Sequence, residues 1–243
     1  MFPLYGMGET AENVAEKYKI SREDQDAFAL GSHKKACAAW ANGSFDDEVE
    51  PVHIKLRKSE HTVTKDEGPR ADTNLEKLTK LKPAFRKGGS VTAGNSSSMN
   101  DGAAMVVVVS EEFLKRHNLS PIAEVTGMGV RGVHPDFMGL GPIEATKTLC
   151  KRFNHKVEDF DAIELNEAFA VQALACMKDL KLDPSKVNLH GGAIALGHPL
   201  GCSGARILTT LIGVMKQDPA KKKGLATMCI GVGQGVALSV EMC

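Results

Sequence analysis

The chain has 243 residues, of which 42% are hydrophobic, so it can bury a sizeable core as one large or two smaller domains. Its 30 lysines and arginines balance its 30 aspartates and glutamates, which leaves no overall field to attract polyanions and argues against nucleic acid as a partner. No apolar run approaches a membrane span, and the first eight residues show neither a secretory-signal nor a transit-peptide pattern.

The six cysteines indicate a reducing compartment. None belongs to a Cys-x-x-Cys pair, and most lie in apolar segments. Structural disulfides are rare in the cytosol, and metal-binding cysteines usually come as closely spaced pairs. We therefore expect free thiols, a cytoplasmic protein and no metal site.

The first hundred residues are predicted to form two helices followed by an irregular, surface-lying region. The pattern favours helices over 8–19 and 21–42, the second capped by Ser21 with an aspartate three residues later. A strand is predicted over 49–56, and the stretch that follows is charged and rich in turn-forming residues. Residues 77–89 are strongly basic.

A continuous apolar run from Ala103 to Val109 is typical of a strand buried on both faces, and a short helix to His117 follows it. After a boundary near 118–121 the pattern alternates regularly. Strands are expected at 122–130, 161–165, 187–195, 225–230 and 235–241, with helices at 142–153, 167–180 and 202–216. This β-α-β-α-β-α-β-β order predicts an α/β fold with a largely parallel sheet covered on both faces and a final antiparallel hairpin at its edge.

Three loops in this second half place an amide, an imidazole and a thiol just after strand-like runs: Asn166, His198 and Cys229. In open α/β sheets reactive groups gather at the carboxyl ends of strands, so these residues are candidates for one active site. Taken alone, Asn166 followed by Glu167 is better explained as a helix cap.

The glycine-rich stretch 190–206 is more specific. It lacks the Gly-Lys-Ser/Thr ending of a phosphate-binding P-loop, and it holds His198 rigidly between Gly197 and Pro199. A histidine that is merely buried does not require such a presentation. The alternative, a structural histidine, carries less weight here.

Cys229 needs the same comparison, because a cysteine in an apolar strand is usually a small buried hydrophobe. The glycines at 231, 233 and 235 favour a functional thiol over one that only packs in the core. Their spacing, and the strand-like residues after them, exclude a dinucleotide-binding loop. A strand that ends at Cys229 and turns back through glycines presents the thiol and the Gly231 amide toward one point.

Together, Asn166-Glu167-Ala168-Phe169, Gly197-His198-Pro199-Leu200-Gly201 and Cys229-Ile230-Gly231 resemble the catalytic loops of thiolases, the enzymes that make or cleave β-ketoacyl-CoA. The resemblance implies a CoA-binding loop domain at 1–98, a remnant strand and helix of the N-terminal core domain at 99–118, and a C-terminal core domain at 119–243. It also implies that the acyl-accepting cysteine lies in a domain that would precede Met1. The chain then corresponds to the last three-fifths of a thiolase.

The resemblance implies a role for each candidate. His198 takes a proton from the absent thiol and, with a water held by Asn166, stabilises the enolate oxygen of the thioester. Cys229 is the acid/base that moves the α-proton, with a pKa depressed by surrounding dipoles. The Gly231 amide contributes to a second oxyanion hole, and Glu167 orients the histidine and water network.

The resemblance also implies that CoA is contacted by Ser97 at the pantetheine, by Arg70 near the adenine and phosphates, and by Met138 and Phe169 along the acyl tunnel. Met7 belongs to the segment that opens the loop domain. No cofactor is expected beyond the CoA thioester substrate. The expected partners are acyl-CoA or CoA, a thiolase N-terminal half or subunit, and a second copy of the chain in a homo-oligomer when the enzyme is complete. The setting would be fatty acid metabolism.

Two departures from the family pattern stand out. Gly6 occupies a position where short-chain biosynthetic thiolases usually have histidine, so a preference for acetoacetyl-CoA is not supported. Val232 stands where thiolases generally have glycine, and a β-branched residue is strained there if φ is positive.

Three interpretations remain open. The chain is the acid/base and CoA-binding part of a split thiolase-type acyltransferase, inactive alone; or a non-catalytic remnant that binds CoA or pairs subunits; or a fragment of an ordinary thiolase.

Overall fold

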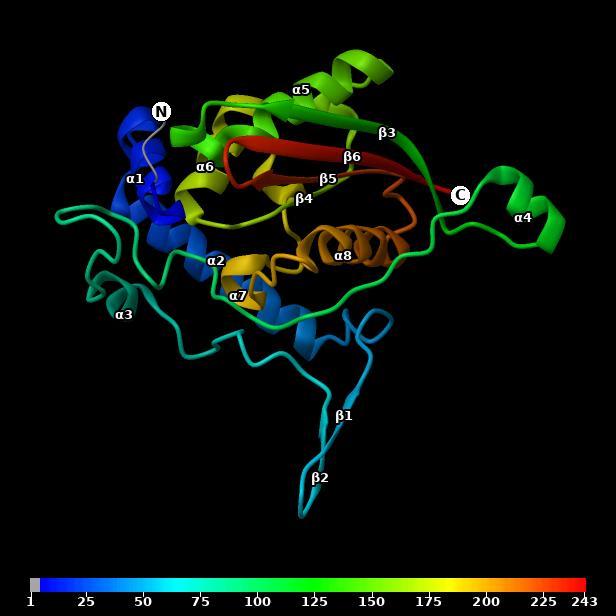
Figure 1. Ribbon diagram of the computed structural model, residues 1–243, viewed down its shortest axis with the longest axis horizontal. Coiled ribbons are helices and arrows are strands. Elements are labelled where there is room, and N and C mark those ends of the chain that lie inside the picture. The colour runs from blue at the N-terminus through cyan, green and yellow to red at the C-terminus, as the bar shows by residue number, and fades with distance from the viewer. Residues whose placement is uncertain (1–4) are drawn as a thin grey trace.

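The computed structural model describes residues 5–243 as a four-stranded mixed sheet with helices on both faces and a long loop region beside it (Figure 1). The helices are α1 (Met7–Tyr18), α2 (Arg22–Ala41), α3 (Leu75–Thr79), α4 (Glu111–His117), α5 (Gly141–Phe153), α6 (Ala170–Leu180), α7 (Ala193–Leu196) and α8 (Ser203–Gln217), with short 3-10 turns η1 (Pro135–Leu140), η2 (Val157–Asp159) and η3 (Pro184–Lys186). The strands are β1 (Val52–Lys55), β2 (Glu60–Val63), β3 (Ala123–Gly132), β4 (Ala162–Leu165), β5 (Lys223–Ile230) and β6 (Gln234–Met242).

The main sheet has the order β3-β6-β5-β4. β4 and β5 are parallel, whereas β6 runs antiparallel to both of its neighbours. The α/β class and the final hairpin are confirmed. The expectation of a largely parallel sheet with this hairpin at its edge is wrong, because β6 lies between β5 and β3. Periodicity along the chain identifies a buried strand but not the strand that will lie beside it.

The strand predicted over 187–195 is also wrong, and its absence has a local cause. Val187 makes a single parallel bridge to Ile163, and the chain then turns away at Asn188, which adopts a left-handed φ of 47°. The Asn188 side chain replaces the next backbone partner, since its Oδ1 accepts from Leu165 N at 2.8 Å and its Nδ2 donates to Leu165 O at 2.9 Å.

Helices cover both faces of the sheet. α5 packs on β3 and β6, where Gly129 has no room for a side chain because a Cβ would meet the backbone of Ala145. α8 covers β4 and β5 from the other face, with Leu211 and Met215 in its buried cluster. Each large apolar side chain buried this way contributes about 1.5–3 kcal/mol. No helix in the described part of the chain is long and apolar enough to cross a membrane.

The loop region packs against this core through its first two helices. α1 and α2 confirm the predicted helices, and Ser21 caps α2 by accepting a hydrogen bond from Asp24 N at 3.0 Å. Ala11 and Val14 of α1 belong to the main core cluster. The predicted strand over 49–56 becomes β1, which pairs with β2 in a hairpin that projects from the body of the molecule (Figure 1).

The apolar run from Ala103 to Val109 forms no strand and is exposed, with Met105 at 85% and Val107 at 83% exposure. The predicted buried strand is therefore absent. A strand needs a neighbour to pair its backbone groups and cover its faces, and no described segment lies in that position. The run leads past α8 to α4, the short helix predicted to reach His117, which lies at the periphery (Figure 1).

Candidate functional site

The candidate site lies at the carboxyl ends of β4 and β5. Because these strands are parallel neighbours, their ends meet at the same edge of the sheet. Asn166 directly follows β4, and its backbone N–H donates to Thr227 O of β5 at 3.0 Å. Cys229 is the penultimate residue of β5. Asn166 and Cys229 therefore lie at the same edge of the sheet.

The side chain of Asn166 points to His198 and does not cap a helix. α6 begins at Ala170 with Phe169 at its N-cap position, so the helix-cap interpretation of Asn166 is wrong. Asn166 is 1% exposed, and its Nδ2 lies 3.3 Å from His198 Nε2. Among the described residues its buried Oδ1 has no hydrogen-bond partner, which leaves an acceptor for a water or a substrate group.

His198 is held through its backbone and through both ring nitrogens. Its N–H donates to Ser98 O at 3.1 Å, and its Nδ1 lies 2.6 Å from Ser203 Oγ. The preceding Gly197 has a φ of 95°, which a residue with a side chain would adopt only with strain. Burial, with a smaller contribution from the positive charge of Arg206, lowers the pKa of His198. The imidazole is therefore neutral near pH 7 and can accept a proton.

The pKa of Cys229 is raised, whereas we expected it from the sequence to be depressed. Its side chain is 5% exposed within the core cluster that also contains Phe169, and burial raises the pKa of this thiol to about 12. The backbone hydrogen bond that favours the thiolate is the weaker influence. At neutral pH the thiol is protonated, so in this state it can donate a proton rather than accept one.

The turn after β5 confirms the strain predicted for this segment. Val232 has a left-handed φ of 66° and is 79% exposed. Gly231 is exposed, and nothing lies within 4 Å of the position where its Cβ would be. The space on the Cβ side of Gly231 is therefore open.

Among the described residues Glu167 makes no hydrogen bond to His198, so its predicted role in orienting the histidine and water network stays a prediction. The carboxylate is buried and accepts from Ser32 Oγ at 2.6 Å, Asn188 Nδ2 at 2.8 Å and Ile194 N at 3.2 Å. These partners come from α2, from the segment after η3 and from α7. Glu167 thus ties the loop region to the core behind the site.

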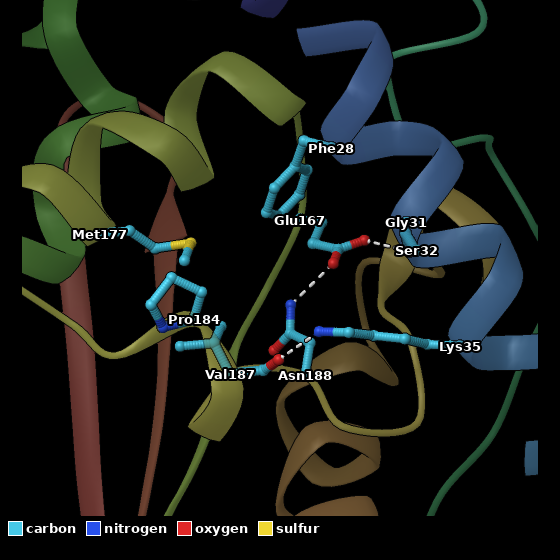
Figure 2. Close-up of a pocket in the computed structure, with 9 residues that line it drawn as sticks. All are labelled: Phe28, Gly31, Ser32, Lys35, Glu167, Met177, Pro184, Val187 and Asn188. Atoms are coloured by element: carbon cyan, nitrogen blue, oxygen red, sulfur yellow. Dashed lines mark hydrogen bonds between the residues drawn. The ribbon is translucent and has the colours of Figure 1, made fainter. Parts of the chain in front are cut away.

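A cavity of about 130 Å³ lies beside Glu167, between α2 and the end of α6 (Figure 2). Phe28, Met177 and Pro184 supply apolar walls, and Lys35 Nζ donates to a backbone carbonyl at 2.8 Å. Burial lowers the pKa of Lys35. None of the residues predicted to contact CoA lines this cavity.

Two of the residues predicted to contact CoA lie next to the Asn166 loop. Ser97 donates to Ala168 O through both its backbone N and its Oγ, each at 3.0 Å. Phe169 pairs with Ser96 in an isolated antiparallel bridge and is 8% exposed. The loop 91–102 therefore packs directly on the segment that carries Asn166.

The other three predicted CoA contacts are more dispersed. Met138 is buried at 4% exposure in the core cluster that contains Phe169. Arg70 is exposed, and its backbone N donates to His33 Nδ1 at 3.2 Å. Met7 is exposed at the start of α1.

Sequence reasoning missed a buried contact between a glutamate and an arginine behind the site. Glu164 of β4 is 2% exposed and lies 3.5 Å from Arg206 Nη1 of α8. Burial raises the pKa of Glu164 to about 8, outweighing the opposing effect of Arg206. A carboxylate in an otherwise apolar strand was the available signal. Ser203 was also missed as a partner of His198, although it lies only five residues further along the chain.

Comparisons with known proteins agree with this arrangement. Residues 119–242 match the family model described as thiolase, C-terminal domain, and residues 1–112 match the model described as thiolase, N-terminal domain. Two relatives from Staphylococcus aureus, strains COL and MRSA252, are each 52% identical over 242 residues and are described as probable acetyl-CoA acyltransferases. These alignments cover 99% of this chain and 61% of each relative, so the chain spans about three-fifths of their length.

Solved structures give the same result. The crystal structure of the Bacillus anthracis acetyl-CoA acetyltransferase superposes with a TM-score of 0.96 at 50% identity, covering 98% of this chain and 60% of that one. Human mitochondrial 3-ketoacyl-CoA thiolase superposes with a TM-score of 0.91 at 44% identity, with the same coverage. With both family models matched and the fold shared, this chain belongs to the thiolase family.

Proposed function

We propose that the chain supplies the acid/base groups and the CoA-binding surface of a thiolase-type acyltransferase. The acyl-accepting cysteine then comes from a partner segment, which corresponds to the part of the relatives that this chain does not span. The observation that carries the proposal is the contact between Asn166 and His198 at the end of β4, 3.3 Å between Nδ2 and Nε2. A neutral, positioned imidazole is suited to accept the proton of an incoming thiol.

The rest of the site supports the same chemistry. The protonated thiol of Cys229 is suited to return a proton to a carbanion, and in the opposite direction it removes the α-proton only once bound substrate lowers its pKa. The unpartnered Asn166 Oδ1 can hold a water that donates to the thioester oxygen. Gly231 is exposed in the turn after β5, which suits the proposed contribution of its amide to a second oxyanion hole.

Ser97, Phe169, Met138, Arg70 and Met7 remain the proposed CoA-binding residues. Ser97 and Phe169 lie beside the catalytic loop, which suits contact with the reacting end of a pantetheine arm. Arg70 is exposed and charged, which suits contact with phosphate.

Exposed apolar surface supports partners for this chain. Met105, Val107 and Val108 of the extended run, and Met128 and Val130 of β3, are each at least half exposed. Such patches mark association surfaces. The partner segment is proposed to cover them, whereas the projecting hairpin, with Val52 and Leu56 exposed, is proposed to join copies of the completed enzyme in a homo-oligomer. Six free cysteines support a cytoplasmic location.

The test is reconstitution. The chain alone should show no thiolysis of acetoacetyl-CoA or of a longer 3-ketoacyl-CoA, because no nucleophile is available for the covalent step. Co-expression with the unmatched N-terminal segment of a Staphylococcus aureus relative should yield a complex by size-exclusion chromatography with light scattering, and this complex should catalyse acyl transfer.

Substitutions separate catalysis from assembly. His198→Ala and Cys229→Ala should abolish turnover in the complex and leave the complex intact. Arg70→Ala should raise the KM for CoA. A complex that assembles and binds CoA but transfers no acyl group would refute the catalytic proposal and favour the CoA-binding or subunit-pairing module. Turnover by the chain alone would refute the need for a partner.

A further inference from the structure

A buried serine contacts the ring nitrogen of His198 that Asn166 does not reach. Ser203 is the first residue of α8 and is 0% exposed. Its Oγ lies 2.6 Å from His198 Nδ1 and 3.0 Å from Pro199 O, to which it donates. Both ring nitrogens of the imidazole therefore contact neutral side chains, Nε2 that of Asn166 and Nδ1 that of Ser203.

The direction of these hydrogen bonds determines where the imidazole carries its proton. A serine hydroxyl has one proton, and because that proton points to Pro199 O the oxygen remains as an acceptor for Nδ1–H. At the other end, the amide of Asn166 donates to Nε2. In the Asn166 orientation of this structure, the opposite tautomer would set Nε2–H against the amide N–H group, and it would take the Ser203 hydroxyl away from Pro199 O.

We propose that Ser203 is a positioning residue that holds neutral His198 in the Nδ1–H tautomer, which leaves Nε2, the nitrogen beside Asn166, unprotonated and able to accept a proton. The effect of this tautomer on catalysis rests on the proposed function. When a thiol replaces the Asn166 amide as the donor to Nε2, the S–H bond breaks and an Nε2–H bond forms, giving a thiolate and an imidazolium, while Nδ1–H remains hydrogen-bonded to Ser203 Oγ. A neutral serine fixes the ring without the charge that would raise its basicity, which suits a base that must be unprotonated near pH 7.

Nuclear magnetic resonance of the full chain with ¹⁵N-labelled histidine tests the tautomer without requiring any activity. Long-range ¹H–¹⁵N correlations distinguish Nδ1–H from Nε2–H, and the His198 signals are those lost in His198→Gln. The expected result is an Nδ1–H tautomer for neutral His198 in the unsubstituted chain. An Nε2–H tautomer overturns the proposal whatever the variants below show.

Ser203→Ala tests the role of the hydroxyl. In this variant the Pro199 carbonyl still accepts hydrogen bonds from the backbone N–H groups of residues 202 and 203, at 2.9 Å each. The turn therefore keeps its backbone hydrogen bonds. His198 should then shift toward a mixture containing Nε2–H. Thr209→Ala is the matched control, because Thr209 Oγ1 also donates to a carbonyl within α8, that of Ala205 at 3.0 Å. An unchanged tautomer in Ser203→Ala, or an equal shift in Thr209→Ala, overturns the proposal.

Activity of the reconstituted complex separates this inference from the proposed function. Ser203→Ala should lower kcat about 10-fold or more, within the contribution of a positioned general base, and should leave the KM for CoA unchanged. An inactive unsubstituted complex in which His198 is the Nδ1–H tautomer refutes the proposed function and leaves the tautomer assignment standing. An active complex in which His198 is the Nε2–H tautomer supports the proposed function and overturns the tautomer assignment.

Discussion

Replacing Val232 by glycine should stabilise the chain. Val232 has a φ of 66° in the turn between β5 and β6, where a side chain with a branched Cβ crowds the backbone. The left-handed conformation costs a residue with a side chain about 1–2 kcal/mol. Its side chain is 79% exposed, so its removal uncovers little buried apolar surface.

The gain is smaller than the strain because glycine has more freedom in the unfolded chain. That freedom costs about 0.4–1 kcal/mol, which leaves a net stabilisation of about 0.5–1 kcal/mol for Val232→Gly. For a chain of this size each kcal/mol raises Tm by about 2–4 °C, so the expected rise is about 1–4 °C. Val232→Asn should give a part of this gain, since asparagine tolerates a positive φ.

Urea unfolding followed by circular dichroism measures the change through the midpoint at constant slope. Val108→Gly is the matched control, because Val108 is 75% exposed and is absent from the described residues with positive φ. The control should be neutral or destabilising. A Val232→Gly variant no more stable than the original chain, or one that behaves as Val108→Gly does, would show that the turn stores no strain.

Three further outcomes are expected. Limiting iodoacetamide, followed by mass-spectrometric mapping, should label exposed Cys243 first and Cys229 late, because burial raises the pKa of Cys229 to about 12; early labelling of Cys229 would contradict this. Burial raises the pKa of Glu164 from 4.5 to about 8, so the folded state binds this proton more tightly than the unfolded chain, and stability falls as pH rises between these values. Glu164→Gln should therefore gain stability over the original chain above pH 8 and lose that advantage near pH 5, and parallel urea-unfolding profiles would argue against it. Glu167→Ala should destabilise by about 2–4 kcal/mol in the same assay, since it leaves the buried donors of Ser32, Asn188 and Ile194 without an acceptor; a loss below about 1 kcal/mol would mean that water replaces the carboxylate.

The sequence by itself determined the α/β class and most helices, and it indicated candidate site residues, of which Asn166 and His198 lie in contact. Local signals suffice for these features. Ser21 marks the start of α2 through its side chain, and the glycine and proline around His198 mark a rigid loop at one position along the chain. The strain at Val232 was equally local, because it depends on one side chain in one turn.

Tertiary structure decided what depends on neighbours. Which segments are available for pairing explains three features. β6 lies between β3 and β5, the Asn188 side chain replaces the strand predicted over 187–195, and residues 103–109 are exposed. The acid–base properties of the site residues also depend on their neighbours in the folded chain. Burial rather than motif sets the pKa of Cys229, and a hydroxyl from α8 holds His198, because solvation and hydrogen-bond direction belong to the folded surroundings of a group and not to its position in the chain.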